Sequence, residues 1–106
     1  MKKYLVFETK EQAERSIPVN QIKKIRIDQF HFCLANTVKG FRAFEIDCPH
    51  LGDDLSRGTL NPIGEVICPW HSYRFDLLSG EESENRCKTL KVFRTDWESG
   101  QLFVFL

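Results

Sequence analysis

The sequence predicts an all-β fold, an antiparallel sandwich or barrel, with one short helix near the N-terminus. About eight or nine short runs of β-branched, aromatic and aliphatic residues follow one another closely along the chain of 106 residues. Several of these runs alternate apolar and polar side chains with a period of two, and Gly, Pro, Asn and Ser separate them. Closely spaced strands of this kind usually pair antiparallel through short connections.

The first elements are a strand, a helix and a second strand. Residues 4–7 form a short apolar run with high strand propensity. Thr9 and Gln12 have the spacing of a capping box, which predicts a helix over residues 10–15 that a following proline ends. Residues 22–27 place three isoleucines among lysines and an arginine, which indicates a strand with a basic exposed face.

A β-hairpin is predicted next. Residues 30–35 alternate large apolar side chains with smaller or polar ones, the pattern of a strand that is buried on one face. A turn at residues 38–40 leads to the second arm at residues 41–46. Cys33 is expected to be a small core residue, and His31 a surface residue that binds no metal.

The second half of the chain is expected to contribute short strands between loops. Residues 65–67 and 73–76 are predicted strands, and residues 81–86 a polar, exposed loop. Residues 89–93 and 102–105 are interpreted as two strands joined through a Glu-Ser-Gly turn.

Length and composition limit the possible functions. Residues 1–106, of which 42% are hydrophobic, are enough for one domain and leave no room for a separate catalytic domain. No apolar run reaches the roughly 20 residues of a membrane span, and the N-terminus lacks the apolar stretch of a signal peptide. We therefore expect a cytoplasmic protein with no membrane partner.

The charge distribution argues against a nucleic-acid partner. The net charge is zero, but residues 43–85 carry nine Asp or Glu against two Lys or Arg. A surface that binds nucleic acid is basic, so this acidic segment is not expected to do so.

Two short stretches in that acidic segment each combine a thiol with an imidazole. Cys-Pro-His-Leu-Gly occupies residues 48–52 and Cys-Pro-Trp-His residues 68–71, with seventeen residues between the first His and the second Cys. In a reducing compartment such cysteines are more often metal ligands or core residues than disulfides. The spacing leaves a zinc site open, although zinc knuckles usually pair Cys with Cys and His with His.

These stretches resemble the signature of a Rieske [2Fe–2S] domain, Cys-x-His followed after a gap by Cys-x-x-His. The resemblance continues through Ser-Tyr-Arg-Phe-Asp at residues 72–76. It implies a Rieske-like sandwich or barrel with a small cluster-binding subdomain of two loops, at about residues 46–76. It also implies one [2Fe–2S] cluster per chain. The implied ligands are Cys48 and Cys68 on one iron, and His50 and His71 on the other.

The function implied by the resemblance is electron transfer rather than catalysis. Such a protein is a soluble one-electron carrier that passes electrons from a reductase to an acceptor such as an oxygenase. Two alternatives remain open. One is a small subunit of a larger oxidoreductase, similar to that of assimilatory nitrite reductase, and the other is a structural zinc module that mediates interactions.

Five neighbours of the ligands are expected to shield or adjoin the cluster. They are Leu51, Gly52, Trp70, Tyr73 and Phe75. Asp53 and Trp70 stand where high-potential Rieske proteins carry two cysteines that form a disulfide, so that bond is absent here. Tyr73 and Phe75 stand where those proteins carry a Ser and a Tyr that hydrogen-bond the cluster or its cysteine ligand.

The missing hydroxyl at Phe75 leads to the first prediction. Fewer hydrogen bonds to sulfur stabilise the reduced cluster less, which lowers the reduction potential. We expect a midpoint at the low end of the Rieske range, about −150 mV. A redox titration followed by EPR measures it, and a midpoint above about +100 mV would contradict the prediction.

Overall fold

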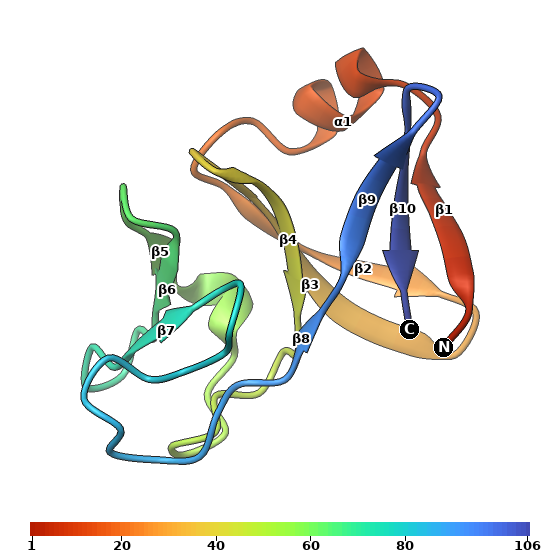
Figure 1. Ribbon diagram of the computed structural model, residues 1–106. Coiled ribbons are helices and arrows are strands. Elements are labelled where there is room, and N and C mark those ends of the chain that lie inside the picture. Colours follow the sequence, from red (N-terminus) through yellow and green to blue (C-terminus); the bar gives the residue numbers. More distant parts are fainter.

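The computed structural model describes residues 1–106 and contains three antiparallel sheets, one α-helix and one 3₁₀ helix (Figure 1). The elements in chain order are β1 (Lys3–Phe7), α1 (Lys10–Ser16), β2 (Ile22–Ile27), β3 (Phe30–Thr37), β4 (Gly40–Phe44), η1 (Leu55–Arg57), β5 (Thr59–Leu60), β6 (Glu65–Ile67), β7 (Arg74–Asp76), β8 (Val92–Phe93), β9 (Thr95–Glu98) and β10 (Gln101–Phe105). The predicted all-β antiparallel class with one short N-terminal helix is confirmed.

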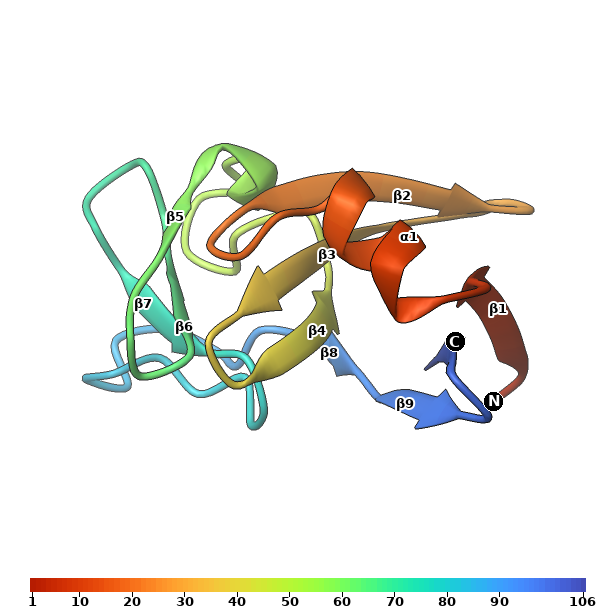
Figure 2. The same cartoon turned by 90° about the horizontal axis from the view of Figure 1, so that it is seen from above.

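The three sheets follow one another along the length of the molecule. Their strand orders are β1-β10-β9, β2-β3-β4-β8 and β5-β6-β7. Both ribbon views place the β5-β6-β7 sheet and the long loops at one end, and the β1-β10-β9 sheet toward the other (Figures 1 and 2). The two ends of the chain meet, because Lys2 and Leu106 exchange backbone hydrogen bonds of 2.8 and 3.0 Å.

Strand β3 is buried on both faces over most of its length. Phe32 and Leu34 pack into one hydrophobic cluster, with residues of α1 and β10. Cys33 and Ala35 point the other way, into a second cluster that includes residues of the β5-β6-β7 sheet. The prediction of one buried face was wrong. Small residues such as Cys33 and Ala35 fit a buried or an exposed face, so their alternation with larger residues does not show whether a second layer covers them. Cys33 is fully buried and His31 exposed, as predicted.

The C-terminal hairpin differs from the prediction in its first arm. β10 pairs with β9, with Trp97 opposite Leu102. The segment predicted as that arm instead contributes β8, which pairs with β4. Thr95 and Asp96 are polar, so β9 gave no apolar pattern, yet a tight Ser-Gly turn joins it to β10 as hairpin pairing requires. The short elements η1 and β5 had no periodic signal and were not predicted.

Helix α1 begins where the sequence predicts. The backbone N–H of Gln12 donates to Thr9 Oγ1 (3.0 Å), and Gln12 Oε1 accepts from the backbone N–H of Glu8 (2.8 Å). These bonds satisfy two donors at the helix start. Its inner face buries Ala13, with Ile17 following at the helix end. No helix in the structure combines the length and the apolar character needed to cross a membrane.

Two glycines allow the chain to pass very close to other backbone. A Cβ at Gly80 would lie 2.0 Å from the carbonyl oxygen of Leu90, and the φ of Gly80 is +82°. Gly58, by contrast, has a φ of −75°. It is required for a different reason, because a Cβ there would lie 2.4 Å from the carbonyl oxygen of Ile67.

We predict that Gly80→Ala destabilises the fold far more than Gly100→Ala. Both positions have a positive φ, at +82° and +79°, but only Gly80 has backbone within reach of the added methyl group. The left-handed conformation costs about 1–2 kcal/mol for a residue with a Cβ. We therefore expect a loss of about 1 kcal/mol at Gly100 and more than about 3 kcal/mol at Gly80. Urea denaturation measures both, and equal losses would contradict the role assigned to Gly80.

Candidate metal centre

The first loop of the predicted site is closed by backbone hydrogen bonds at its base. The N–H of Leu55 donates to the carbonyl of Ile46, and the N–H of Cys48 to that of Asp53, both at 2.8 Å. The N–H of Gly52 donates to the carbonyl of Cys48 (2.7 Å), and the φ of Gly52 is +80°. Glycine adopts this conformation without strain, so the loop can turn back tightly around Cys48.

The second loop joins β6 to β7 and contains two residues in an unusual conformation. The N–H of Cys68 donates to the carbonyl of Tyr73 (2.8 Å), which closes the loop. His71 and Ser72 at its tip have φ values of 68° and 56°. Side chains with a Cβ rarely adopt this conformation, and strain of this kind gathers at functional sites. Sequence reasoning did not predict it, since neither residue is a glycine.

The two loop cysteines lie together in the protein interior. Cys48 and Cys68 are 3% and 1% exposed and belong to one hydrophobic cluster. Burial, together with the adjacent Cys48 thiol, raises the pKa of the Cys68 thiol to about 11. A metal bound here would therefore have to displace the thiol protons, because thiolates are the ligand form.

The two loop histidines also lie together, nearer the surface. The ring centroids of His50 and His71 are 5.4 Å apart, with His50 half-buried and His71 exposed. Thiols thus adjoin thiols inside and imidazoles adjoin imidazoles outside. No group of three or more His, Cys, Asp or Glu side chains surrounds a single metal position.

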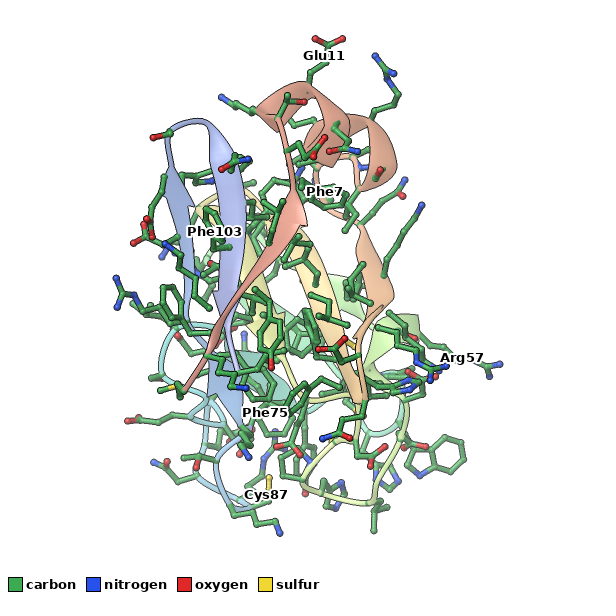
Figure 3. All side chains as sticks on the ribbon, turned by 90° about the vertical axis from the view of Figure 1, so that its right-hand side faces the viewer. Phe7, Glu11, Arg57, Phe75, Cys87 and Phe103 are labelled. Atoms are coloured by element: carbon green, nitrogen blue, oxygen red, sulfur yellow. The ribbon has the colours of Figure 1, made fainter.

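The expected neighbours of the ligands occupy three different settings. Leu51 and Trp70 are 61% and 56% exposed, and the Trp70 ring lies 5.5 Å from that of His71. That they shield a bound cluster stays a prediction, since here they flank the imidazoles in solvent. Phe75, which is labelled in Figure 3, is fully buried in the same hydrophobic cluster as the two cysteines. Tyr73 stacks on His50, with centroids 3.9 Å apart and planes at 8°.

A third loop, which sequence reasoning missed, also reaches the site. Residues 81–86 were predicted to be exposed, but Glu82 is only 2% exposed and pairs with Arg86 at 2.7 Å. The Arg86 guanidinium carbon lies 3.7 Å from the centroid of the Tyr73 ring. Cys87 follows, half-buried, toward the lower end of the molecule in Figure 3. The only sequence signal was the opposite charges of Glu82 and Arg86 four residues apart, which does not indicate burial.

The family model described as "Rieske [2Fe-2S] domain" matches residues 4–94, which is most of the chain. The chain belongs to the Rieske [2Fe–2S] domain family. Among curated proteins it is similar to the methanesulfonate monooxygenase ferredoxin subunit of Methylosulfonomonas methylovora. The two are 28% identical over 87 residues, which cover 82% of this chain and 71% of that protein.

Two solved structures share the fold over nearly their whole length. The carbazole 1,9a-dioxygenase ferredoxin of Nocardioides aromaticivorans IC177 has a TM-score of 0.77 and 16% identity, covering 98% of this chain and 97% of its own. A candidate NADH-dependent nitrite reductase small subunit from Mycobacterium tuberculosis has a TM-score of 0.79 and 15% identity, covering 97% and 93%.

The donor set fits the [2Fe–2S] cluster that the Rieske family implies. A Rieske cluster takes two cysteines on one iron and two histidines on the other. The structure supplies one pair of buried thiols and one pair of neighbouring imidazoles, from two loops that are each closed at their base. The other two cysteines lie outside the two loops, since Cys33 is on β3 and Cys87 directly follows the third loop.

The ion pair between the buried Glu82 carboxylate and the exposed Arg86 predicts how the stability of this Rieske domain depends on pH. Hydrogen bonds from Arg86 hold the pKa of Glu82 at about 2, below its ordinary value of 4.5. A depressed pKa contributes stability above pH 4.5, and this contribution is lost as the pH falls from 4.5 toward 2. We expect Glu82→Gln to unfold more easily than wild type at pH 7, and the difference to shrink below pH 4.5.

Urea denaturation at a series of pH values measures this difference. Glu84→Gln is the matched control, because Glu84 is exposed and its contact with Arg86 is longer, at 3.5 Å. A difference between wild type and Glu82→Gln that does not change with pH would contradict the assignment.

Proposed function

We propose that this protein is a one-electron carrier and that residues 1–106 form one Rieske domain. Its cluster-binding loops span about residues 46–76, as the loop closures at Ile46 and Tyr73 support. The proposed ligands are Cys48 and Cys68 for one iron, and His50 and His71 for the other. The single observation that carries the proposal is that the two thiols lie together in the interior and the two imidazoles lie together nearer the surface.

The bound cluster supplies a centre that takes up and returns a single electron. The chain supplies the surroundings. Burial of the two cysteines excludes water from the thiolate side. The exposed ring of His71 brings the imidazole side to the surface, where a partner protein can approach it.

The proposed partners are a reductase as donor and an oxygenase component as acceptor. The names of two similar proteins support this, since one is the ferredoxin subunit of a monooxygenase and the other the ferredoxin of a dioxygenase. Leu51 and Trp70 lie exposed beside the imidazoles and would give such partners apolar contact area. We place the exchange in the cytoplasm, as the sequence predicts.

A fixed subunit of a larger oxidoreductase is the second candidate. The fold shared with a candidate nitrite reductase small subunit over nearly both chains favours it. Turnover of the terminal enzyme with substoichiometric amounts of this protein distinguishes the two. A mobile carrier supports many turnovers per molecule, whereas a fixed subunit supports activity only in proportion to the complexes that it completes.

We predict two irons and two sulfides per chain in the purified protein. The expected protein is red-brown and gives the EPR signal of a [2Fe–2S] centre after reduction. One zinc per chain in a colourless protein would overturn the proposal in favour of the zinc module.

Matched cysteine variants test the ligand set. Cys68→Ser should lose most of the cluster, because one iron loses one of its two proposed thiolate ligands. Cys87→Ser should keep both irons, since Cys87 lies close to the site but outside the two loops. Loss of iron from Cys87→Ser and its retention in Cys68→Ser would show that the ligands are assigned wrongly.

A further inference from the structure

A line of direct contacts runs from the buried carboxylate of Glu82 to the proposed ligand His50. Glu82 Oε2 accepts a hydrogen bond from Arg86 Nη2 (2.7 Å). The Arg86 guanidinium carbon lies 3.7 Å from the centroid of Tyr73, and the Tyr73 ring is stacked on His50 at 3.9 Å. Three of these four residues lie outside the Cys-x-His and Cys-x-x-His motifs.

Glu82 fixes the position of the arginine. Its Oε1 accepts from the backbone N–H groups of Glu84 (3.2 Å) and Arg86 (2.8 Å) and from Arg86 Nε (3.2 Å). Its Oε2 accepts from Ser83 Oγ (3.1 Å) as well as from Arg86 Nη2. A guanidinium held at two nitrogens by one carboxylate has a defined plane, unlike a lysine ammonium.

The third loop is in turn held against β7. The backbone N–H of Ser83 donates to the carbonyl of Arg74, and that of Asp76 to the carbonyl of Glu81, both at 2.9 Å. Tyr73 directly precedes β7. The arginine and the tyrosine are therefore fixed on neighbouring, hydrogen-bonded segments rather than on free loops.

The tyrosine ring lies between the arginine and the histidine. Both groups approach the same ring centroid to within 4 Å, at 3.7 and 3.9 Å. Two planar groups this close to one centroid would collide on a single face, so they occupy opposite faces. The negative face of an aromatic ring attracts a cation, and the stacking with His50 restricts rotation of the imidazole.

We propose that Tyr73 and Arg86 are positioning residues for His50, and that the Arg86 cation favours the reduced state of the cluster. This inference rests on the ligand set of the proposed function. The stack holds the plane of His50, and it places the positive end of the Glu82–Arg86 pair nearer to the imidazole. Reduction adds one negative charge to the cluster, which a nearby cation stabilises.

The other proposed imidazole ligand is held differently. His71 is exposed and lies 5.5 Å from the ring of Trp70, which is itself 56% exposed. His50 is thus the imidazole held by stacking on Tyr73, and His71 the one open to a partner.

The test compares iron-loaded variants by redox titration and EPR. Arg86→Gln should lower the ratio of reduced to oxidised cluster at a fixed potential about threefold, which is about 30 mV for one electron. Arg86→Lys should recover part of this loss, because it keeps the charge but not the two-nitrogen contact. Tyr73→Leu should change the EPR line shape, whereas Tyr73→Phe, which keeps the ring, should restore it.

The matched control is Arg94→Gln. Arg94 also pairs with a carboxylate, Asp96 at 3.0 Å, and lies over an aromatic ring, Phe105 at 4.6 Å, but it is in the β1-β10-β9 part of the molecule. This variant should leave the potential unchanged.

The outcomes separate the two claims. A wild-type protein without two irons overturns the proposed function, and this inference with it. Fully loaded Arg86→Gln that titrates like wild type and like Arg94→Gln overturns the inference alone. If Tyr73→Leu fails to fold, the comparison of Arg86→Gln with Arg94→Gln still decides, since both replace arginines at the surface.

Discussion

The burial of β3 on both faces is the constraint on which the rest of the structure depends. Phe32 faces the cluster shared with α1 and β10, whereas Cys33 and Ala35 face the cluster that contains Cys48 and Cys68. Protein interiors are closely packed, and side chains within them have little freedom to shift. The proposed ligand thiols are therefore positioned by the central sheet, and the two proposed cluster-binding loops are an extension of the core rather than an attachment to it.

The fold class and most strands could be predicted from the sequence, because hydrophobic period and turn residues act locally. The two faces of β3 could not be distinguished, since small residues such as Cys33 and Ala35 are compatible with either burial or exposure. The pairing of β9 with β10 was missed for a related reason. The polar residues of β9 form no apolar run, and they become a strand only because β10 pairs with them.

The proposed ligands could be predicted because two rare, metal-binding residue types recur there at a specific spacing. The surroundings of these ligands could not be predicted, since they arise only when segments distant in sequence meet in the folded chain. Glu82 was assigned to an exposed loop on its polarity, yet the structure buries it with five hydrogen bonds to its carboxylate. The left-handed backbone of His71 and Ser72 was equally hidden, because it is imposed by the closure of the loop between β6 and β7. Local patterns predicted the chemistry, and the tertiary structure determines how each proposed ligand is held.

The central claim is that two imidazoles, and two only, bind one side of a [2Fe–2S] cluster. Pulsed EPR of the reduced protein, with ¹⁵N in histidine alone, tests it most directly. The chain has three histidines, of which His31 lies exposed at the start of β3, outside the two loops. Our account predicts strong coupling of the electron spin to nitrogens of two histidines, His50 and His71. Coupling to one histidine, to none or to all three would contradict it.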